Sequence, residues 1–199
     1  SVKSRGLGDV YKRQNLLSVL ETKYNVKHVN KEVKFLNPDI PLVVCAGVNS
    51  RELAKTIGDN LPIYPVKGYS ITIHNPEVAP WTSMLDDGAK IVTSRLGEDR
   101  LRVAGTAELN GYNTDIIQRR IRPLIRWSEK MFPGINTEYI TPWAGLRPMT
   151  PYMMPIVKRS KRNDNIYYNT GHGHLGWTLS AYTAQKIAEQ ITESSDAQK

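Results

Sequence analysis

Apolar residues form short continuous or alternating runs in the middle of this chain and helix-like spacings towards its ends. Leu42 to Ala46 is a continuous apolar run, which is typical of a strand buried on both faces. Turn residues such as Asp86-Asp87-Gly88 and Gly97-Glu98-Asp99 separate the later runs, as they do in hairpins. We therefore expect an antiparallel meander with strands at Val66–Ile73, Trp81–Leu85, Lys90–Ser94 and Leu101–Ala107.

Helices are predicted where apolar residues recur on one face of a 3.6-residue period. Thr114–Phe132 brings Ile117, Ile121 and Leu124 to one face, and Pro123 should kink or interrupt this helix. The other predicted helices are Leu16–Tyr24, Arg51–Ile57 and Leu179–Ile191, and the other predicted strands are Val26–Val29, Val33–Leu36, Glu138–Trp143 and Ile166–Tyr168. Together these elements predict an α/β (α+β) protein with a mixed sheet.

The first 14 residues carry a net charge of +3, out of +8 for the whole chain. The 199 residues have a formal net charge of +8, and residues 1–14 hold four basic residues against Asp9, so the rest carries +5. Residues 1–14 resemble a translated sequencing-adapter tail, and we expect them to be foreign to the fold and disordered. Without them the charge excess is modest and no nucleic-acid-binding motif accompanies it, so we expect no nucleic-acid partner.

Segments that would direct the protein to a membrane or a secretory route are not evident in this sequence. It has neither a run of 18 apolar residues nor an apolar signal region near its start. Cys45 is the single cysteine, so it cannot form an internal disulfide, which suits a reducing compartment. Because Cys45 lies in the apolar run, we expect a buried and unreactive thiol.

The stretch Asn169–Thr178 holds three glycines between a predicted strand and a predicted helix. Gly171-x-Gly173-x-x-Gly176 matches a dinucleotide fingerprint literally. That motif requires a second parallel strand with an acidic residue after the helix, and none follows, so we reject a nucleotide-phosphate site. Two interpretations remain: a turn whose glycines and helix N-terminus approach an electron-rich ligand, and a turn that binds nothing.

Four motifs in order favour the first interpretation. They are Pro65-Val-Lys-Gly-Tyr-Ser-Ile-Thr-Ile73, Gly105-Thr-Ala-Glu-Leu-Asn-Gly-Tyr-Asn-Thr114, Trp143-Ala-Gly-Leu-Arg-Pro-Met-Thr-Pro151 and Asn169-Thr-Gly-His-Gly-His-Leu-Gly-Trp177. With these motifs, the chain from about Leu42 to Ile191 resembles the C-terminal part of FAD-dependent D-amino acid dehydrogenases, within the D-amino acid oxidase superfamily. Leu42-Val-Val-Cys-Ala-Gly47 is similar to the strand that ends in alanine-glycine in the family.

The resemblance implies a truncated FAD-binding, Rossmann-like core with an antiparallel β-rich substrate domain. The family opens with a strand-GxGxxG-helix unit for the ADP half of FAD, and nothing like it precedes Leu42. We therefore expect a C-terminal portion that is inactive alone. We expect residues 15–62 and 143–191 to form the FAD-binding core and residues 63–142 to form the substrate domain. Residues 1–14 and 192–199 are expected to be tails.

The resemblance also implies the chemistry and the site. A D-amino acid would lose a hydride to FAD and yield a 2-oxo acid and ammonia. Arg147 is the expected catalytic residue that holds the substrate carboxylate, since a guanidinium binds a carboxylate bidentately; a structural arginine is the alternative. His172 is the second expected catalytic residue. The expected cofactor-binding residues are Gly47, Gly171, His172, Gly173, His174, Leu175, Gly176, Trp177 and Thr178.

The remaining pocket residues have open alternatives. His174 stands where the family usually has a smaller residue, so it would narrow the substrate channel. Tyr69 and Trp143 are expected pocket walls, although aromatic residues are also common in cores. We expect no metal, because no Cys or carboxylate cluster completes a tetrahedral set around His172 and His174. Tyr152-Met153-Met154 departs from the usual Asp-Gly turn, which leaves the substrate range open.

The expected partners are a D-amino acid and a quinone or other respiratory-chain acceptor. The basic run of Lys158, Arg159, Lys161 and Arg162 is either a solvated loop or a peripheral contact with an anionic membrane. We expect a cytoplasmic location. If the basic run contacts an anionic membrane, the protein would be peripheral on the inner membrane. Two alternative functions are a non-enzymatic basic binding domain and another superfamily member of the glycine or sarcosine oxidase type.

Overall fold

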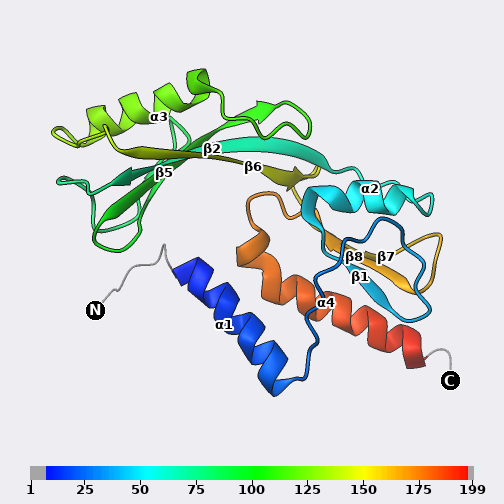
Figure 1. Cartoon of the computed structure of the whole chain (residues 1–199). Coiled ribbons are helices and arrows are strands. Elements are labelled where there is room, and N and C mark those ends of the chain that lie inside the picture. Colours follow the sequence, from blue (N-terminus) through cyan, green and yellow to red (C-terminus); the bar gives the residue numbers. More distant parts are fainter. Residues whose placement is uncertain (1–7, 197–199) are drawn as a thin grey trace. The chain divides into compact units, whose positions relative to one another are not determined.

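The computed structural model describes the backbone of residues 8–196 and the side chains of residues 15–194. Figure 1 labels most of its helices and strands. The elements are α1 (Gly8–Lys23), β1 (Leu42–Val44), the short 3-10 helix η1 (Gly47–Asn49), α2 (Ser50–Lys55), β2 (Tyr64–His74), β3 (Leu85–Asp86), β4 (Ile91–Arg95), β5 (Arg100–Leu109), α3 (Gln118–Met131), β6 (Ile140–Met149), β7 (Ile156–Arg159), β8 (Ile166–Thr170) and α4 (Gly176–Asp196). None of the described helices is long and apolar enough to cross a membrane.

The chain divides into two compact units, each built from separate stretches of sequence. Unit 1 contains the chain up to Lys31, Gly68–Glu108 and Thr114–Gly145, and unit 2 contains Glu32–Lys67, Leu109–Asn113 and the chain from Leu146 onward. Within residues 15–191 the grouping differs from the expected one at four stretches, and two of these, residues 63–67 in unit 2 and residues 143–145 in unit 1, are short boundary shifts. Residues 15–31 belong to unit 1 rather than with residues 32–62, and residues 109–113 leave the meander to join unit 2.

Unit 2 is organised around a three-stranded sheet in the order β1-β8-β7. β1 runs parallel to β8, with Leu42 opposite Ile166, and β7 runs antiparallel to β8. Ile166 and Tyr168 of β8 pack with Ala54 of α2, whereas α4 packs against β7 and β8, and Figure 1 shows these helices on opposite sides of the sheet. Because β1 and β8 are parallel, their carboxyl ends lie at one edge, where Gly47 and Gly171 follow.

Unit 1 contains most of a five-stranded sheet in the order β3-β4-β5-β2-β6. β4 pairs antiparallel with β3 and β5, which confirms the later part of the predicted meander, whereas residues 81–84 of the strand expected at Trp81–Leu85 form no strand and β3 is only Leu85–Asp86. Alternate residues of β2, such as Ile71 and Ile73, form a core with Ile121 and Leu124 of α3, which covers one face of the sheet (Figure 1). This alternation is the pattern of a sheet with one face packed on a helix.

Several predicted strands are wrong or shorter than expected. Residues 24–41 form no regular strand, so the expected strands at Val26–Val29 and Val33–Leu36 are absent from this described stretch. Most of these side chains are exposed, and an isolated strand without partners does not satisfy its backbone groups. β1 ends at Val44 on the edge of its sheet, so Cys45 is exposed rather than buried.

Helix boundaries also differ from the sequence prediction. α1 begins at Gly8, so residues 8–14 belong to a helix rather than to a disordered tail; residues 1–7 lie outside the described residues. α3 begins at Gln118 and includes Pro123 without interruption. The missing N–H of Pro123 leaves only the carbonyl of Arg119, near the start of the helix, without its usual donor. α4 extends to Asp196 and so includes part of the expected tail.

Candidate active site

The glycine-rich turn between β8 and α4 has a backbone that only glycine fits well. Gly171 and Gly173 adopt φ angles of +74° and +58°, in the left-handed region that side chains disfavour. A β-carbon at Gly171 would lie 2.8 Å from Cγ2 of Thr150, and one at Gly173 would lie 2.7 Å from the Met149 sulfur. The turn therefore packs closely against the segment that follows Arg147.

Two hydrogen bonds fix this turn within unit 2. The Gly173 N–H donates to the carbonyl of Pro148 at 3.0 Å, which attaches the turn to the end of β6. The Thr170 hydroxyl donates to the carbonyl of Gly47 at 3.1 Å, which joins the ends of β8 and β1. The structure thus brings together Gly47 and the Gly171–Thr178 segment, which sequence analysis assigned to one site.

The start of α4 presents backbone donors beside this turn. Within the described residues, no acceptor is recorded for the N–H groups of Gly176, Trp177 and Thr178. The Leu175 and Trp177 side chains are each more than a third exposed. A helix N-terminus carries partial positive charge, so this edge suits an electron-rich or anionic ligand. These features fit the flavin that the resemblance implies.

Arg147 offers a half-buried cation close to the turn. It lies on β6 directly before Pro148, and burial lowers the pKa of its guanidinium below the ordinary value. No hydrogen bond or acidic partner is recorded for its side chain among the residues that the structure describes. A half-buried guanidinium without a carboxylate suits a carboxylate ligand, because the pair forms two parallel charge-assisted hydrogen bonds.

The two histidines of the turn have different surroundings. The His172 ring is half-buried, and its Nε2 atom lies 3.1 Å from the hydroxyl of Thr183, a buried residue of α4. Burial lowers the pKa of His172, so its imidazole is neutral near pH 7. His174 is exposed. No group of three possible metal-binding side chains is found in the described part of the chain.

Trp143 and Tyr69, both in unit 1, differ in their exposure to solvent. The Trp143 ring is 54% exposed and lies over Gly145, and the Arg102 guanidinium is 5.1 Å from its centre. Trp143 is therefore accessible to a ligand. Tyr69, in contrast, is 1% exposed within the core, and its hydroxyl donates to Glu108. The expectation that Tyr69 lines a pocket is wrong in this structure, because its hydroxyl points into the core.

A bulge in β5 explains why Glu108 is buried where Tyr69 can donate to it. Thr106 adopts a φ of +58°, which is rare for a β-branched residue. Leu101 and Val103 face the core before it, and Glu108 is also buried beyond it, so the strand changes its alternation at Thr106. A bulge of this kind has no clear signature in a single sequence.

Tyr152–Met154, where the sequence departs from the usual Asp-Gly, lie in a hydrogen-bonded turn between β6 and β7. Met153 adopts a φ of +56° in the turn between β6 and β7, and its N–H donates to the Thr150 carbonyl at 3.1 Å. The Thr150 hydroxyl donates to the Met154 carbonyl at 2.8 Å. All three bulky side chains are exposed, with Tyr152 at 87%. A methionine therefore holds a conformation that favours glycine.

Sequence reasoning missed two contributors to the site. Met149 and Thr150 form the surface on which Gly171 and Gly173 rest, and Thr183 contacts His172 from α4. The positions of Met149 and Thr150 in the Trp143–Pro151 motif were visible, although nothing in the sequence showed what they pack against. The spacing of eleven residues between His172 and Thr183 gives no signal of contact.

Comparison with known proteins relates this chain to one family. A family model described as "DAO: FAD dependent oxidoreductase" matches residues 2–190. D-amino acid dehydrogenase 3 of Mesorhizobium japonicum is 61% identical over 155 residues, which cover 75% of this chain and 37% of that protein. D-amino acid dehydrogenase of Dechloromonas aromatica is 44% identical over 153 residues, which cover 75% of this chain and 36% of that protein.

A solved structure shows the same fold at low identity. The glycine oxidase of Geobacillus kaustophilus superposes with a TM-score of 0.69 at 20% identity, covering 77% of this chain and 41% of the oxidase. The chain thus spans little more than a third of the length of the two curated relatives above. The family match includes residues 2–14, and the foreign origin of the first 14 residues stays a prediction.

Proposed function

This chain belongs to the DAO family of FAD-dependent oxidoreductases, and from that premise we propose that its protein oxidises D-amino acids to 2-oxo acids and ammonia. Identity of 61% to a protein named D-amino acid dehydrogenase supports this substrate class. The half-buried Arg147 guanidinium carries the proposal, because an amino acid substrate brings a carboxylate and no described residue supplies one.

Bound FAD would supply the hydride acceptor for the substrate α-carbon, and the resulting imino acid would be hydrolysed to the 2-oxo acid and ammonia. Arg147 binds the substrate carboxylate bidentately and so fixes the direction of the α C–H bond. The exposed indole of Trp143 stays a proposed wall for the substrate side chain. His174, which is exposed, is proposed to narrow the substrate channel.

The Gly171–Thr178 segment is the proposed flavin-facing surface. The N–H groups at the start of α4 stabilise negative charge there, and they are already oriented because α4 is anchored to the sheet. Gly47 borders the segment through its bond with Thr170. We propose that His172 acts as a neutral donor or acceptor whose ring is oriented by Thr183.

The proposed electron acceptor is a quinone or another respiratory-chain component, reached from the cytoplasmic face of the inner membrane. Both curated relatives are named dehydrogenases rather than oxidases, which favours an acceptor other than oxygen. The basic run Lys158–Arg162 supports a peripheral contact with anionic lipid, since each basic side chain contributes about 1 kcal/mol of attraction near such a surface.

The proposed activity is tested by dye-linked turnover of the FAD-loaded enzyme with a panel of D- and L-amino acids and with glycine and sarcosine. Turnover restricted to D-amino acids, with release of the 2-oxo acid, supports the proposal. A preference for glycine or sarcosine would instead favour the glycine oxidase type. No turnover with any of these amines by an enzyme that retains its flavin would exclude both.

A further inference from the structure

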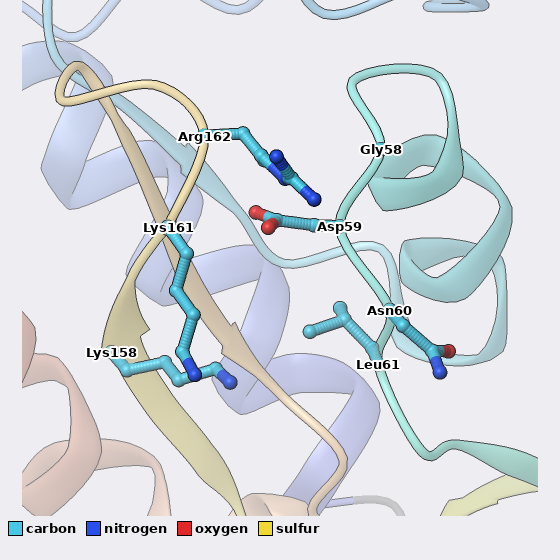
Figure 2. A pocket seen from close by; sticks show the side chains of 7 residues that line it. All are labelled: Gly58, Asp59, Asn60, Leu61, Lys158, Lys161 and Arg162. Atoms are coloured by element: carbon cyan, nitrogen blue, oxygen red, sulfur yellow. The ribbon is translucent and has the colours of Figure 1, made fainter.

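Unit 2 contains a cavity at the outer end of the β7–β8 hairpin. It measures about 330 Å³, near the lower end of the roughly 300–1,000 Å³ typical of small-molecule sites. Figure 2 shows the loop after α2 on one side and side chains from β7 and the hairpin loop on the other. The lining residues are Gly58, Asp59, Asn60, Leu61, Lys158, Lys161 and Arg162.

This cavity is separate from the candidate active site. Ile156 of β7 lies opposite Thr170, beside the glycine turn, whereas Arg159 lies opposite Tyr167, near the other end of β8. The loop after Arg159, with Lys161 and Arg162, therefore stands at the far edge of the sheet from Gly171, and Lys158 lies opposite Tyr168, between the two edges. Four or five strand residues separate the two edges, which corresponds to roughly 13–17 Å. A ligand in this cavity would not be the substrate beside Arg147.

Three cations around the cavity have no acidic partner. Lys158, Lys161 and Arg162 form no ion pair within the part of the chain that the structure describes. Arg159, in the same basic run, differs: it pairs with Asp164 at 3.2 Å. The cavity wall also contains one carboxylate, that of Asp59, so the three cations and this anion give the wall a formal charge of +2. Three like charges around one cavity repel one another unless an anion lies between them.

The carboxylate of Asp59 has a structural task. Asp59 is 9% exposed, and its Oδ2 atom accepts hydrogen bonds from the Ser160 hydroxyl and, at 2.8 Å, from the Tyr168 hydroxyl. Ser160 in turn accepts the N–H groups of Arg162 and Asn163 at 3.0 and 3.2 Å. These bonds hold the backbone of the loop that carries Lys161 and Arg162, and the two exposed side chains extend from this fixed loop.

We propose that this cavity is a phosphate-binding site. A phosphate monoester carries about 1.5–2 negative charges near pH 7 and a lipid phosphodiester about one, so both offset charge on the +2 wall, and both accept hydrogen bonds from lysine and arginine together. The cavity exceeds the size of one phosphate, so the group belongs to a larger molecule. That molecule is either an anionic phospholipid headgroup or a soluble phosphate ester. The site does not depend on the flavin reaction.

Phosphate binding is measured by titrating the 199-residue chain with inorganic phosphate and following backbone amide signals by NMR. Saturable shifts confined to residues 58–61 and 158–163 are expected. Replacing two cations, in Lys158→Gln with Lys161→Gln, should weaken binding about a hundredfold, because two charge-assisted hydrogen bonds are lost. The matched control is Lys186→Gln on α4, whose lysine pairs with Glu189 away from the cavity, and it should leave binding unchanged.

The two sources are separated by vesicles. The site is assigned to a lipid headgroup if the chain floats with phosphatidylglycerol vesicles but not with neutral phosphatidylcholine vesicles. This flotation must also be lost in the double variant and be competed by inorganic phosphate. Phosphate binding without flotation assigns it to a soluble phosphate ester. Phosphate shifts that are absent, that do not saturate, or that survive in the double variant would overturn the proposal. Equal loss in Lys186→Gln would also overturn it, since general charge would then explain the binding.

Discussion

The N–H of Gly173 donates a hydrogen bond to the carbonyl of Pro148, and this 3.0 Å contact attaches the glycine turn to the strand that carries Arg147. The proposed substrate cation and the proposed flavin-facing turn are thereby parts of one hydrogen-bonded assembly in unit 2. A change that displaces the turn should therefore affect ligand binding as well as stability.

Gly171→Ala should destabilise the protein more than Gly47→Ala. Both glycines have a positive φ, and placing alanine there costs roughly 1–2 kcal/mol. A β-carbon at Gly171 would also lie 2.8 Å from Cγ2 of Thr150. This clash should add about 1–3 kcal/mol to the destabilisation, because Thr150 is β-branched and hydrogen-bonded and cannot easily move. A β-carbon at Gly47 meets nothing within 4 Å. Denaturant unfolding measures both variants, and equal losses would contradict the packing described for the turn.

Met153→Gly should stabilise the protein by about 0.5–1 kcal/mol, because glycine adopts a left-handed φ without steric cost. Met153 has a φ of +56° and an exposed side chain, so little packing is lost. The neighbouring Met154→Gly is the control. Met154 is similarly exposed without a positive φ, and that change should give no gain. Urea midpoints decide the comparison, and a loss of stability in Met153→Gly would show that its side chain contributes packing.

His172 should make unfolding depend on pH. Burial lowers its folded-state pKa below the ordinary 6.5, so the unfolded chain binds the proton first as pH falls. The stabilising contribution is therefore full above pH 6.5 and is lost as pH falls through the lower, folded pKa. The free energy of unfolding is to be measured between about pH 5 and pH 8. His172→Gln should reduce the loss of unfolding free energy as pH falls, and His174→Gln, at an exposed position, should not. Identical pH profiles of unfolding free energy for the two variants would contradict the role given to His172.

The enzyme should reduce a quinone analogue far faster than it reduces oxygen. It should also sediment with inner-membrane vesicles at low salt and be released at high salt, since surface charges are screened there. Neutralising Lys158, Arg159, Lys161 and Arg162 together should release it while dye-linked turnover is kept. Fast peroxide formation without membrane association would show that oxidase is the better description.

Short-range patterns predicted much of the fold, and long-range pairing accounts for most of what they missed. The meander strands and α4 were recognisable because alternation and helical spacing are local properties. The strands expected at Val26–Val29 and Val33–Leu36 had suitable residues and no partner strand, which a single sequence does not reveal. β7, with residues Ile156–Arg159, went unrecognised because basic residues fill half of this short strand.

The candidate site was predictable mainly where a motif carried it. Gly171, Gly173 and Arg147 stood in recognisable motifs, and the structure shows the glycine turn attached to the end of β6. Tyr69 also stood in a motif, yet its ring is buried, because the motif fixed the strand and not the face. The cavity beside Asp59 depends on contacts about a hundred residues apart in sequence, which no local pattern indicates.

The most direct test of the proposed function compares a good D-amino acid substrate with its amide, which lacks the carboxylate. Wild-type enzyme should prefer the acid in kcat/KM by about a hundredfold, because a bidentate guanidinium–carboxylate pair supplies two charge-assisted hydrogen bonds. Arg147→Ala should lower turnover of the acid and bring the ratio close to one, and Arg147→Lys should recover part of it. An unchanged preference for the acid in folded, FAD-loaded Arg147→Ala would contradict the account.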